Sequence, residues 1–364
     1  MSEGILVVKP GDLGDCVLTT PALRALRLAR PRARIDLLAQ PIASAVVGGT
    51  DLVDEHLRLP RQALDAAARR GPLGLPFLLA FAARLRARRY DACVLLQHLT
   101  TRVGTLKYAG LLLASGAPRR YGLENGRGWF LTERFPDDGF GARHEADYWL
   151  GVVGLLGADP APRPTELPVS DADRRAAADL LRGLTRPIVA LHPGGGDYAT
   201  VARRWAPDRF AALGRRLAER RGASLLVVGN ERGLNAAVAA GCGGRDLSGR
   251  TTLGALAALL GESDLLVSND SGVAHVGAAA GVPMVAIYGQ TDPRAWGPYY
   301  GKPAGDWAEL VQVPLPCRPC LYRRHELGWR HGCATRDCLE LISTGMVLAA
   351  AERQLDRFAT ERRS

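Results

Sequence analysis

Short apolar runs alternate with amphipathic segments in the first half of the chain. Residues 5–9 are apolar, a Gly-containing loop follows, residues 18–29 have helical spacing with Pro21 in the first turn, and residues 35–39 are apolar again. This order predicts a strand–helix–strand unit. The alternation continues with a helix over 75–88, a strand over 92–97, a helix over 103–114, a turn-rich stretch after Arg120 and a helix from His144.

The second half repeats the alternation after a proline-rich linker. Residues 159–187 contain the linker and one helix, whose start carries Ser170, Asp171 and Asp173 at capping positions. The later segments are a strand from 188 into a glycine loop, a helix over 208–220, a strand over 223–230, a helix over 252–263, a strand over 264–270, a helix over 272–281 and a strand over 282–289. Strands that alternate with helices predict parallel sheets in doubly wound domains.

The length of 364 residues indicates two domains, since common domains have about 100–200 residues. Two doubly wound domains that face each other leave a central cleft at the carboxyl ends of their strands, where ligands bind. We place the first domain at 1–168 and the second at 169–345, with the remaining residues 346–364 in a C-terminal helix.

A polar turn follows the predicted strand over 264–270. Asp270, Ser271 and Gly272 lie between that strand and the next helix, so backbone N–H groups and the helix dipole face any anion bound there. Two interpretations are open, because Asp270 or Ser271 either helps to bind an anion or only caps the helix. His275, one turn later, is either a ligand contact or a buried structural histidine.

A glycine triplet follows the strand that begins at residue 188. Gly194, Gly195 and Gly196 let backbone amides approach a phosphate closely, although a triplet by itself also fits a flexible turn. Arg203 and Arg204 stand close enough in the sequence to cover a diphosphate in this loop. Such an arginine neutralises the charge of a leaving group.

An acidic loop follows the first predicted strand. It contains Asp12 and Asp15, and a single carboxylate at this edge accepts a hydroxyl proton as a general base. Asp15 also stands shortly before the predicted helix, so helix capping is the alternative interpretation.

The chain has a formal net charge of +10, and 44 of its 47 basic side chains are arginines because only Lys9, Lys107 and Lys302 are lysines. Arginine forks suit phosphate and carboxylate groups, although the base composition of a genome produces the same excess. Nucleotides, acidic glycans and anionic lipids are therefore favoured partners. Nucleic-acid platforms interleave aromatic and basic residues, whereas aromatic residues here are scattered and make up 6% of the chain, so we expect no nucleic-acid partner.

No segment combines a basic start with a long apolar core, and no apolar run reaches the about 18 residues that a membrane-spanning helix needs. We therefore expect a cytoplasmic protein, with peripheral association at the inner face of the inner membrane as a further expectation.

Several segments together resemble one family. They are GDLGDCVLTTPALRALR, HPGGG followed by ARRWAPDRFAALGRRLAER, VVGNERG, DLSGRTTLGALAALLGESDLLVSNDSGVAHVGAAAGVPMVAIYGQTDPRAWGP and CRPC. In this order, over nearly the whole chain, they are similar to glycosyltransferase family 9, the bacterial heptosyltransferases of lipopolysaccharide core assembly. The resemblance implies an inverting glycosyltransferase with the GT-B fold, whose two Rossmann-like domains face a central cleft. It also implies that the helix within 346–364 crosses back to the first domain.

The resemblance assigns roles to individual positions. Asp15 stands at the place of the family's catalytic aspartate. The implied donor-binding residues are Gly194, Gly195, Gly196, Arg203, Glu231, Asp270, Ser271, Gly272 and His275. Arg203 stands where relatives usually have the lysine of a Lys-x-Trp-Pro pattern and Ala206 replaces the proline, so the charge is kept and the geometry is not. Glu231 resembles the acidic residue that grips the donor ribose.

The implied donor is a nucleotide sugar such as ADP-heptose, and the implied acceptor is an anionic glycan or a lipid-linked core at the inner membrane. Arg119, Arg120 and Arg143 are candidates for holding that acceptor, and a solvated surface explains each of them equally well. Because helix amides and Arg203 already stabilise the leaving diphosphate, we expect no catalytic metal. The alternatives are a protein acceptor, as for autotransporter-type heptosyltransferases, and a non-catalytic protein that binds nucleotides or nucleic acid or acts as a scaffold.

Four cysteines form a C-x2-C-x12-C-x4-C array near the end of the chain. Cys317, Cys320, Cys333 and Cys338 have the spacing that surrounds one tetrahedral Zn²⁺ or iron ion, with His325 and His331 as substitutes. Relatives that glycosylate proteins resemble this loop in carrying an iron-bound cysteine finger. A structural metal is one hypothesis for the loop 317–338, and four free thiols are the other.

Overall fold

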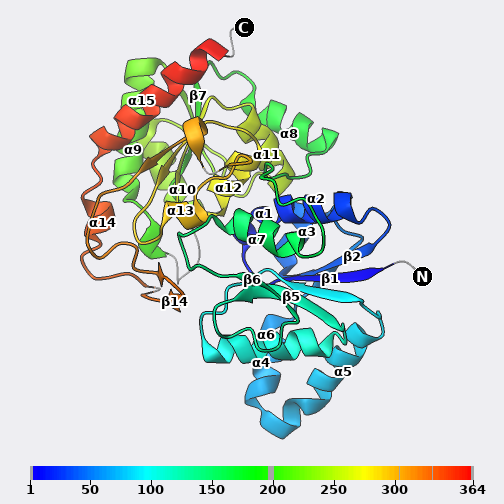
Figure 1. Cartoon of the computed structure of the whole chain (residues 1–364). Helices are drawn as coiled ribbons and strands as arrows, with labels where there is room; N and C mark the ends of the chain where they lie inside the picture. The colour runs from blue at the N-terminus through cyan, green and yellow to red at the C-terminus, as the bar shows by residue number, and fades with distance from the viewer. Residues whose placement is uncertain (1–2, 196–200, 303, 330, 362–364) are drawn as a thin grey trace. The chain divides into compact units, whose positions relative to one another are not determined.

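The computed structural model describes residues 3–195, 201–302, 304–329 and 331–361 (Figure 1). The chain forms two compact units, of which the first contains Met1–Pro162 with Arg324–Glu326 and the second contains Arg163–Arg323 with Leu327–Ser364. Each unit is built on one six-stranded parallel sheet with helices, which confirms the α/β class and the two doubly wound domains. The boundary lies at residue 162, and Arg324–Glu326 of the cysteine-rich loop belong to the first unit.

The first sheet has the strand order β3-β2-β1-β4-β5-β6, with all neighbours parallel. Its strands are β1 (Gly4–Lys9), β2 (Arg34–Ala39), β3 (Glu55–Arg58), β4 (Ala92–Leu95), β5 (Arg119–Glu124) and β6 (Glu133–Pro136). Every residue of β1 and β4 is buried. Because helices cover both faces of such a sheet, its central strands read as continuous apolar runs in the sequence.

Helices lie on both faces of the first sheet (Figure 1). They are α1 (Leu13–Val17), α2 (Thr20–Ala29), α3 (Ser44–Val47), α4 (Arg61–Arg69), α5 (Leu75–Arg86), α6 (Arg102–Ala114) and α7 (Glu145–Gly154). Helix α2 packs against α7 on one face, and α5 packs against α6 on the other. On the second face, Leu6 and Leu95 of the sheet share a core with Leu85 of α5 and Leu112 of α6.

The second sheet has the order β12-β11-β10-β7-β8-β9, also parallel. Its strands are β7 (Ile188–His192), β8 (Ser224–Val227), β9 (Arg245–Asp246), β10 (Leu265–Asn269), β11 (Met284–Ile287) and β12 (Ala308–Val311). Counted from β7, this is the same Rossmann order as in the first sheet. The order reverses between β1 and β4 and between β7 and β10, and ligands of doubly wound sheets bind outside the carboxyl ends at such points.

Helices also cover both faces of the second sheet. They are α8 (Asp171–Leu181), α9 (Pro207–Arg221), α10 (Arg232–Cys242), α11 (Leu253–Gly261), α12 (Gly272–Ala279), α13 (Pro293–Trp296), α14 (Asp337–Glu340) and α15 (Thr344–Glu361), with a ribbon of β13 (Tyr322–Arg323) and β14 (Glu326–Leu327). Val347, Ala351 and Leu355 of α15 share a core with Phe210 of α9 and Ile287 of β11. Helix α15 therefore packs in the second unit, and its crossing back to the first domain stays a prediction.

Most predicted elements are present, and two differences have clear causes. The helix expected over 18–29 begins at Thr20 as α2, and a separate helix α1 precedes it. The two are not continuous, because Pro21 has no N–H for the carbonyl of Val17, which accepts a hydrogen bond from Thr20 Oγ1 (2.8 Å) instead. The stretch expected to be turn-rich after Arg120 contains β5 and β6. These strands carry charged residues and a glycine, so no apolar run marks them.

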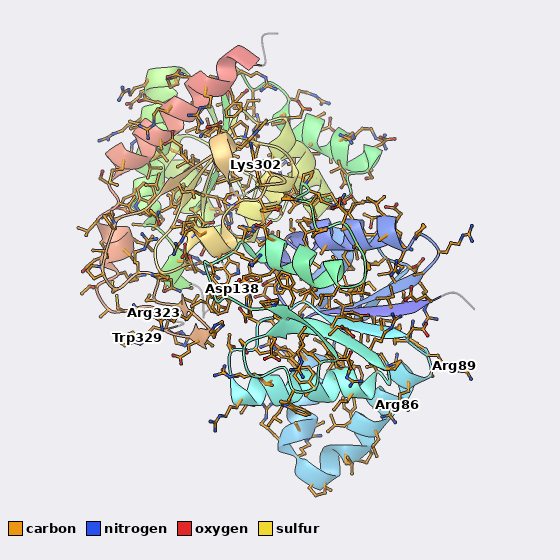
Figure 2. All side chains as sticks on the ribbon, in the orientation of Figure 1. Arg86, Arg89, Asp138, Lys302, Arg323 and Trp329 are labelled. Atoms are coloured by element: carbon orange, nitrogen blue, oxygen red, sulfur yellow. The ribbon has the colours of Figure 1, made fainter. Side chains whose placement is uncertain are left out.

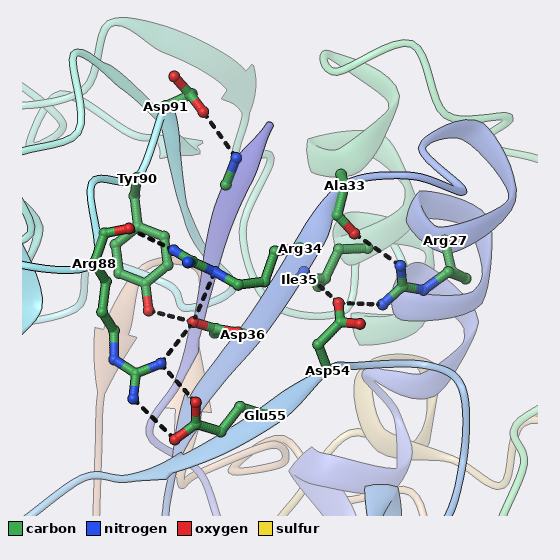
Figure 3. A network of polar contacts seen from close by, with 11 residues as sticks. Arg27, Ala33, Arg34, Ile35, Asp36, Asp54, Glu55, Arg88, Tyr90 and Asp91 are labelled. Atoms are coloured by element: carbon green, nitrogen blue, oxygen red, sulfur yellow. Dashed lines mark hydrogen bonds and ion pairs between the residues drawn. The ribbon is translucent and has the colours of Figure 1, made fainter. Parts of the chain in front are cut away.

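A buried polar network fixes β2 in the first unit (Figure 3). Asp36 has no exposed surface, and its Oδ2 accepts a hydrogen bond from Tyr90 Oη (2.6 Å) and lies 3.1 Å from Arg88 Nη1. Arg88 also forms a two-pronged pair with Glu55 of β3 at 2.6 and 2.9 Å. The buried carboxylate of Asp36 is therefore paired and hydrogen-bonded, as burial of a charge requires.

Candidate functional site

The turn after β10 presents the amino end of α12. Ser271 has extended backbone angles, φ −157° and ψ 168°, and occupies the N-cap position of α12, whose first residue is Gly272. Within the described residues its side chain forms no capping hydrogen bond, and its Oγ lies 3.3 Å from Ser268 Oγ. The hydroxyl of Ser271 therefore does not use up the amides of the first turn, which keeps them available for an anion.

Asp270, the residue before this cap, is paired with Arg203. Arg203 Nη1 lies 3.1 Å from Asp270 Oδ2, and Thr291 Oγ1 donates to the same oxygen at 2.5 Å. The side chain of Asp270 is 3% exposed and that of Arg203 is 22% exposed. Burial of Arg203 works against its charge, but Asp270 outweighs this effect and holds the pKa of Arg203 above its usual value. The arginine is therefore a fixed positive charge beside the amino end of α12.

Asn269 connects the two loops at the switch point. Its Nδ2 donates to the carbonyl oxygens of Pro193 (2.8 Å) and Gly194 (3.0 Å), and its Oδ1 accepts from the backbone N–H of Trp205 at 3.0 Å. One buried amide thus holds the glycine loop after β7 and the segment that carries Arg203. Asn269 was not predicted as a site residue, although its position at the carboxyl end of a buried strand is typical of residues at the binding edge of such a sheet.

The glycine loop is shaped around Glu231. The backbone N–H of Gly195 donates to Glu231 Oε1 at 3.0 Å, and a Cβ atom on Gly194 would lie 2.4 Å from the carboxyl atoms of Glu231. Gly195 has φ +142°, a conformation that only glycine adopts readily. Gly195 is therefore required by its backbone conformation, and Gly194 by the space that the carboxyl group of Glu231 occupies. Gly196, the third predicted glycine, lies outside the described residues.

Glu231 is engaged by protein groups. Burial alone would raise the pKa of Glu231, but the Gly195 N–H and the nearby His192 ring and Arg204 keep that pKa below its usual value. Arg204 Nη2 lies 3.6 Å from Glu231 Oε1, and Arg204 Nε donates to the carbonyl of Gly195 at 3.0 Å. The carboxylate is thus ionised and supports the loop, and its predicted contact with a ribose stays a prediction.

Two buried histidines lie at this edge. His275 is on α12 and is 5% exposed, and His192 ends β7 and is 3% exposed. Burial lowers the pKa of His192, whose Nδ1 lies 2.9 Å from the carbonyl oxygen of Val228. His192 is therefore a neutral ring that supports the loop from β7.

In the first unit, Asp15 lies on α1 after the carboxyl end of β1. Asp15 Oδ2 accepts the backbone N–H of Asp12 at 3.1 Å, so the side chain does help to cap α1. Asp15 Oδ1 lies 3.3 Å from Lys9 Nζ, and Lys9 is 1% exposed with its ammonium 4.2 Å from the ring centroid of Trp149. The side chain of Asp15 is 36% exposed, so the carboxylate is both held in place and accessible. Lys9 and Trp149 were not predicted as site residues.

The three arginines predicted for the acceptor lie at different edges of the first sheet. Arg119 begins β5 beside Ala92, the first residue of β4, and is paired with Glu3 at 2.8 Å. Arg120 Nε donates to the carbonyl of Phe130 at 2.7 Å. Both therefore stand at the amino ends of the strands, away from Asp15. Arg143 follows the carboxyl end of β6, where its Nε donates to Asp138 Oδ2 at 2.9 Å.

A buried histidine cluster, also not predicted, follows β4. His98 is 2% exposed, with its Nδ1 3.0 Å from Asp137 Oδ2 and its Nε2 2.9 Å from Glu145 Oε1. His325 Nδ1 lies 3.5 Å from Asp137 Oδ1. Burial opposes the charge of His98, but Glu145 and Asp137 outweigh it and raise the pKa of His98 to about 9. His98 is therefore a buried cation at the switch point of the first sheet.

The predicted metal site at the four cysteines is not supported by the structure. Cys317 and Cys333 are exposed, Cys320 is half-buried and Cys338 is buried. Across the described parts of the chain, no three Cys, His, Asp or Glu side chains are arranged to hold a metal ion. His325, one of the two predicted substitutes, lies beside Asp137 instead. The spacing of the cysteines along the chain therefore did not predict that the fold would bring them together around a metal ion.

The chain is similar to known glycosyltransferases over most of its length. The family described as glycosyltransferase family 9 (heptosyltransferase) matches residues 78–329. Lipopolysaccharide heptosyltransferase 2 of Escherichia coli K12 is 28% identical over 308 residues, which cover 79% of this chain and 83% of that protein. The solved structure of E. coli ADP-heptose lipopolysaccharide heptosyltransferase II covers 98% of this chain and 99% of its own, with 21% identity and a TM-score of 0.70. A glycosyltransferase family 9 structure from Veillonella parvula covers 98% of this chain and 97% of its own, with 23% identity and a TM-score of 0.71. At these identities the two structures show the fold alone.

Proposed function

Since this chain belongs to glycosyltransferase family 9, we propose that it transfers a heptose from ADP-heptose to the sugar core of a lipopolysaccharide acceptor. The similarity to lipopolysaccharide heptosyltransferase 2 supports lipopolysaccharide as the acceptor, and the E. coli structure named for ADP-heptose supports ADP-heptose as the donor. The similar curated proteins carry lipopolysaccharide or lipooligosaccharide in their names, so the alternative of a protein acceptor is not favoured.

The donor diphosphate binds, in this proposal, at the amino end of α12. The amides of Gly272 and the following residue face one phosphate, and the glycine loop after β7 faces the other. Arg203, held by Asp270, lies beside them. When the bond between the anomeric carbon and the diphosphate oxygen breaks, the negative charge on the departing ADP develops next to these fixed dipoles and this fixed cation.

Asp15 is the general base in this proposal. Its carboxylate takes the proton of the acceptor hydroxyl while that oxygen bonds to the anomeric carbon and ADP leaves from the opposite face, so one displacement inverts the configuration. Lys9 and the Asp12 N–H each hold one oxygen of Asp15. They fix the plane of the carboxylate, so Lys9 acts as a positioning residue.

The transfer in this proposal needs no divalent metal. The charge of the leaving diphosphate is met by the α12 amides and by Arg203, which supply the stabilisation that a metal ion supplies in other transferases. Turnover should stay the same in EDTA and after addition of Mg²⁺ or Mn²⁺. A loss of more than tenfold in EDTA, restored by one cation, would contradict this part of the proposal. Elemental analysis of the same sample tests whether the cysteine loop 317–338 carries zinc or iron.

The Arg203–Asp270 pair at the amino end of α12 is the observation that carries the proposed function. It predicts that ADP binds with the diphosphate at this pair, and that ADP-heptose raises the melting temperature in a thermal-shift panel of nucleotides and nucleotide sugars. UDP and GDP sugars serve as controls for the preference for adenine as the nucleobase of the donor. A panel in which no adenine nucleotide shifts the melting temperature would contradict the donor assignment.

A further inference from the structure

An uninterrupted apolar segment is exposed on the first unit. Residues 71–83 include no polar or charged side chain. They form the 3-10 turn Gly71–Gly74 and most of α5. Leu73 is 86% exposed, Leu75 50%, Phe77 43% and Leu79 59%. We call residues 71–79 the apolar tip. A contiguous group of large exposed apolar side chains marks an interaction surface, because such groups are rare on domains that contact only water.

Only the second half of α5 packs on the first sheet. Leu85 is buried in the core with Leu95 of β4 and Leu112 of α6, and Phe81 packs against the same cluster. Helix α5 also contacts α4 and the turn 71–74, but all large side chains of the apolar tip except that of the half-buried Leu78 remain exposed. The sheet thus anchors one end of α5 and leaves its first two turns uncovered. Helix propensity and packing of the rest of α5 do not require leucine or phenylalanine at these exposed positions.

Arginines flank the apolar tip on both sides. Between residues 61 and 89 the chain has seven arginines and a single acidic residue, Asp65, which is paired with Lys107 at 2.7 Å. Arg69 and Arg70 precede the tip, and Arg84 and Arg86 follow it on α5, all of them exposed. Figure 2 shows Arg86 and Arg89 beside the carboxyl end of α5. Arg69 and Arg70 thus bring positive charge next to the tip, and the other arginines, of which Arg88 is paired with Asp36 and Glu55, follow toward the carboxyl end of α5.

We propose that the apolar tip and its flanking arginines dock this protein on an anionic lipid bilayer. The apolar run is too short to span a bilayer, which takes about 20 residues, and no helix of the described residues is long and apolar enough to do so. A short apolar segment between basic residues instead inserts at the level of the headgroups. Leucine and phenylalanine enter the acyl boundary, while each arginine near the anionic surface adds electrostatic attraction.

A bilayer accounts for both parts of this surface. The arginines supply the charge complementarity to anionic headgroups, and the exposed leucines supply the area that enters the acyl boundary. A second copy of this chain would bring the same arginines against each other, which like charges disfavour. The inference goes beyond the proposed function, because no step of the transfer uses these residues and the test needs no substrate.

Vesicle flotation of the full-length protein tests the inference. The wild type is expected to float with vesicles of phosphatidylcholine and phosphatidylglycerol, to float much less with phosphatidylcholine alone, and to be released by high salt. The double variant Leu73→Glu, Leu79→Glu should lose at least tenfold in the vesicle-bound fraction. Leu28→Glu is the matched control, since Leu28 is an exposed leucine (61%) on α2, and it should float like the wild type.

Three results would overturn the inference: a wild type that does not float, a double variant that floats like the wild type, or an apolar tip that only joins two copies. Light scattering detects the last case as a wild-type dimer that the double variant makes monomeric, without vesicle binding. The melting temperature of the double variant and its turnover on an acceptor without acyl chains should match the wild type. Loss of transfer with intact flotation would contradict the proposed function alone.

Discussion

Arg203 Nη1 and Asp270 Oδ2 are 3.1 Å apart, beside the residue that caps the amino end of α12. The two residues come from different loops, and the pair is largely buried. A guanidinium held in this way does not have to be reorganised when a second anion binds, and this is the condition under which a fixed charge stabilises a leaving group best.

Replacing Arg203 tests this role directly. Arg203→Ala is expected to lower kcat about 10²–10³-fold, the range for loss of one donor that stabilises developing charge. Arg203→Lys should recover part of the loss, because the charge returns without the planar fork. The measurement is ADP release in a coupled assay. The exposed Arg32, replaced by alanine, is the control, and equal turnover of Arg203→Ala and wild type would remove Arg203 from the mechanism.

Asp15 and Lys9 should behave as one unit. Asp15→Ala should lower turnover far more than it weakens ADP binding, since the carboxylate acts on the acceptor hydroxyl. Lys9→Met should lower kcat, because the carboxylate of Asp15 loses the ammonium that holds one of its oxygens. In an Asp15→Asn background, Lys9→Met should have no further effect on kcat. A full additional loss there would show that Lys9 does not act through Asp15.

The glycine loop gives a test of the donor site that leaves the proposed base untouched. A methyl group on Gly194 would lie 2.4 Å from the Glu231 carboxyl atoms, so Gly194→Ala must displace that side chain and the Gly195 amide bonded to it. The Kd for ADP should rise at least tenfold. Gly233→Ala on α10 is the control, because nothing lies within 4 Å of the added atom and a helical alanine is more stable by about 0.5–1 kcal/mol.

The Asp36 network should matter for stability and not for transfer. Asp36→Asn removes the charge that faces Arg88 and weakens the bond to the buried Tyr90 hydroxyl (Figure 3), which should lower the free energy of unfolding by about 1–3 kcal/mol. Glu55→Gln changes the half-exposed partner of Arg88 and should cost less than about 1 kcal/mol. Urea unfolding measures both values. Equal losses of unfolding free energy in the two variants would contradict the expectation that the buried Asp36 matters more for stability than the half-exposed Glu55.

His98 should make the stability of the protein depend on pH. The pKa of His98 is about 9 in the fold against 6.5 for the free side chain, so its contribution is complete below pH 6.5 and is lost as the pH rises through 9. This loss is at most about 3 kcal/mol. Asp137 and Glu145 face His98 directly, and His325 faces Asp137. The free energy of unfolding of His98→Gln should be flatter between pH 6.5 and 9, and parallel profiles for variant and wild type would contradict this.

The pattern of the sequence was sufficient to predict the layout of both domains and part of the site. Parallel strands buried on both faces leave continuous apolar runs, so β1, β4, β7 and β10 could be found, and the polar residues that follow them, such as Asp15 and Asp270, mark the carboxyl edge of each sheet. Strands with charged residues, such as β5, gave no such signal, so the pattern did not indicate that Arg119 and Arg120 stand at the amino end of a strand.

The pairing of side chains was decided by the tertiary structure alone. No local pattern indicates that Arg203 meets Asp270, that Asn269 holds the loop after β7, or that the Lys9 ammonium lies over the ring of Trp149. These contacts join residues that are far apart in the sequence and that only the packing of the domain brings together. The same holds for the four cysteines, whose spacing fits a metal site that the fold does not assemble within the described residues. Sequence periodicity reports which face of an element is buried, whereas the partner across that face depends on packing of the whole domain.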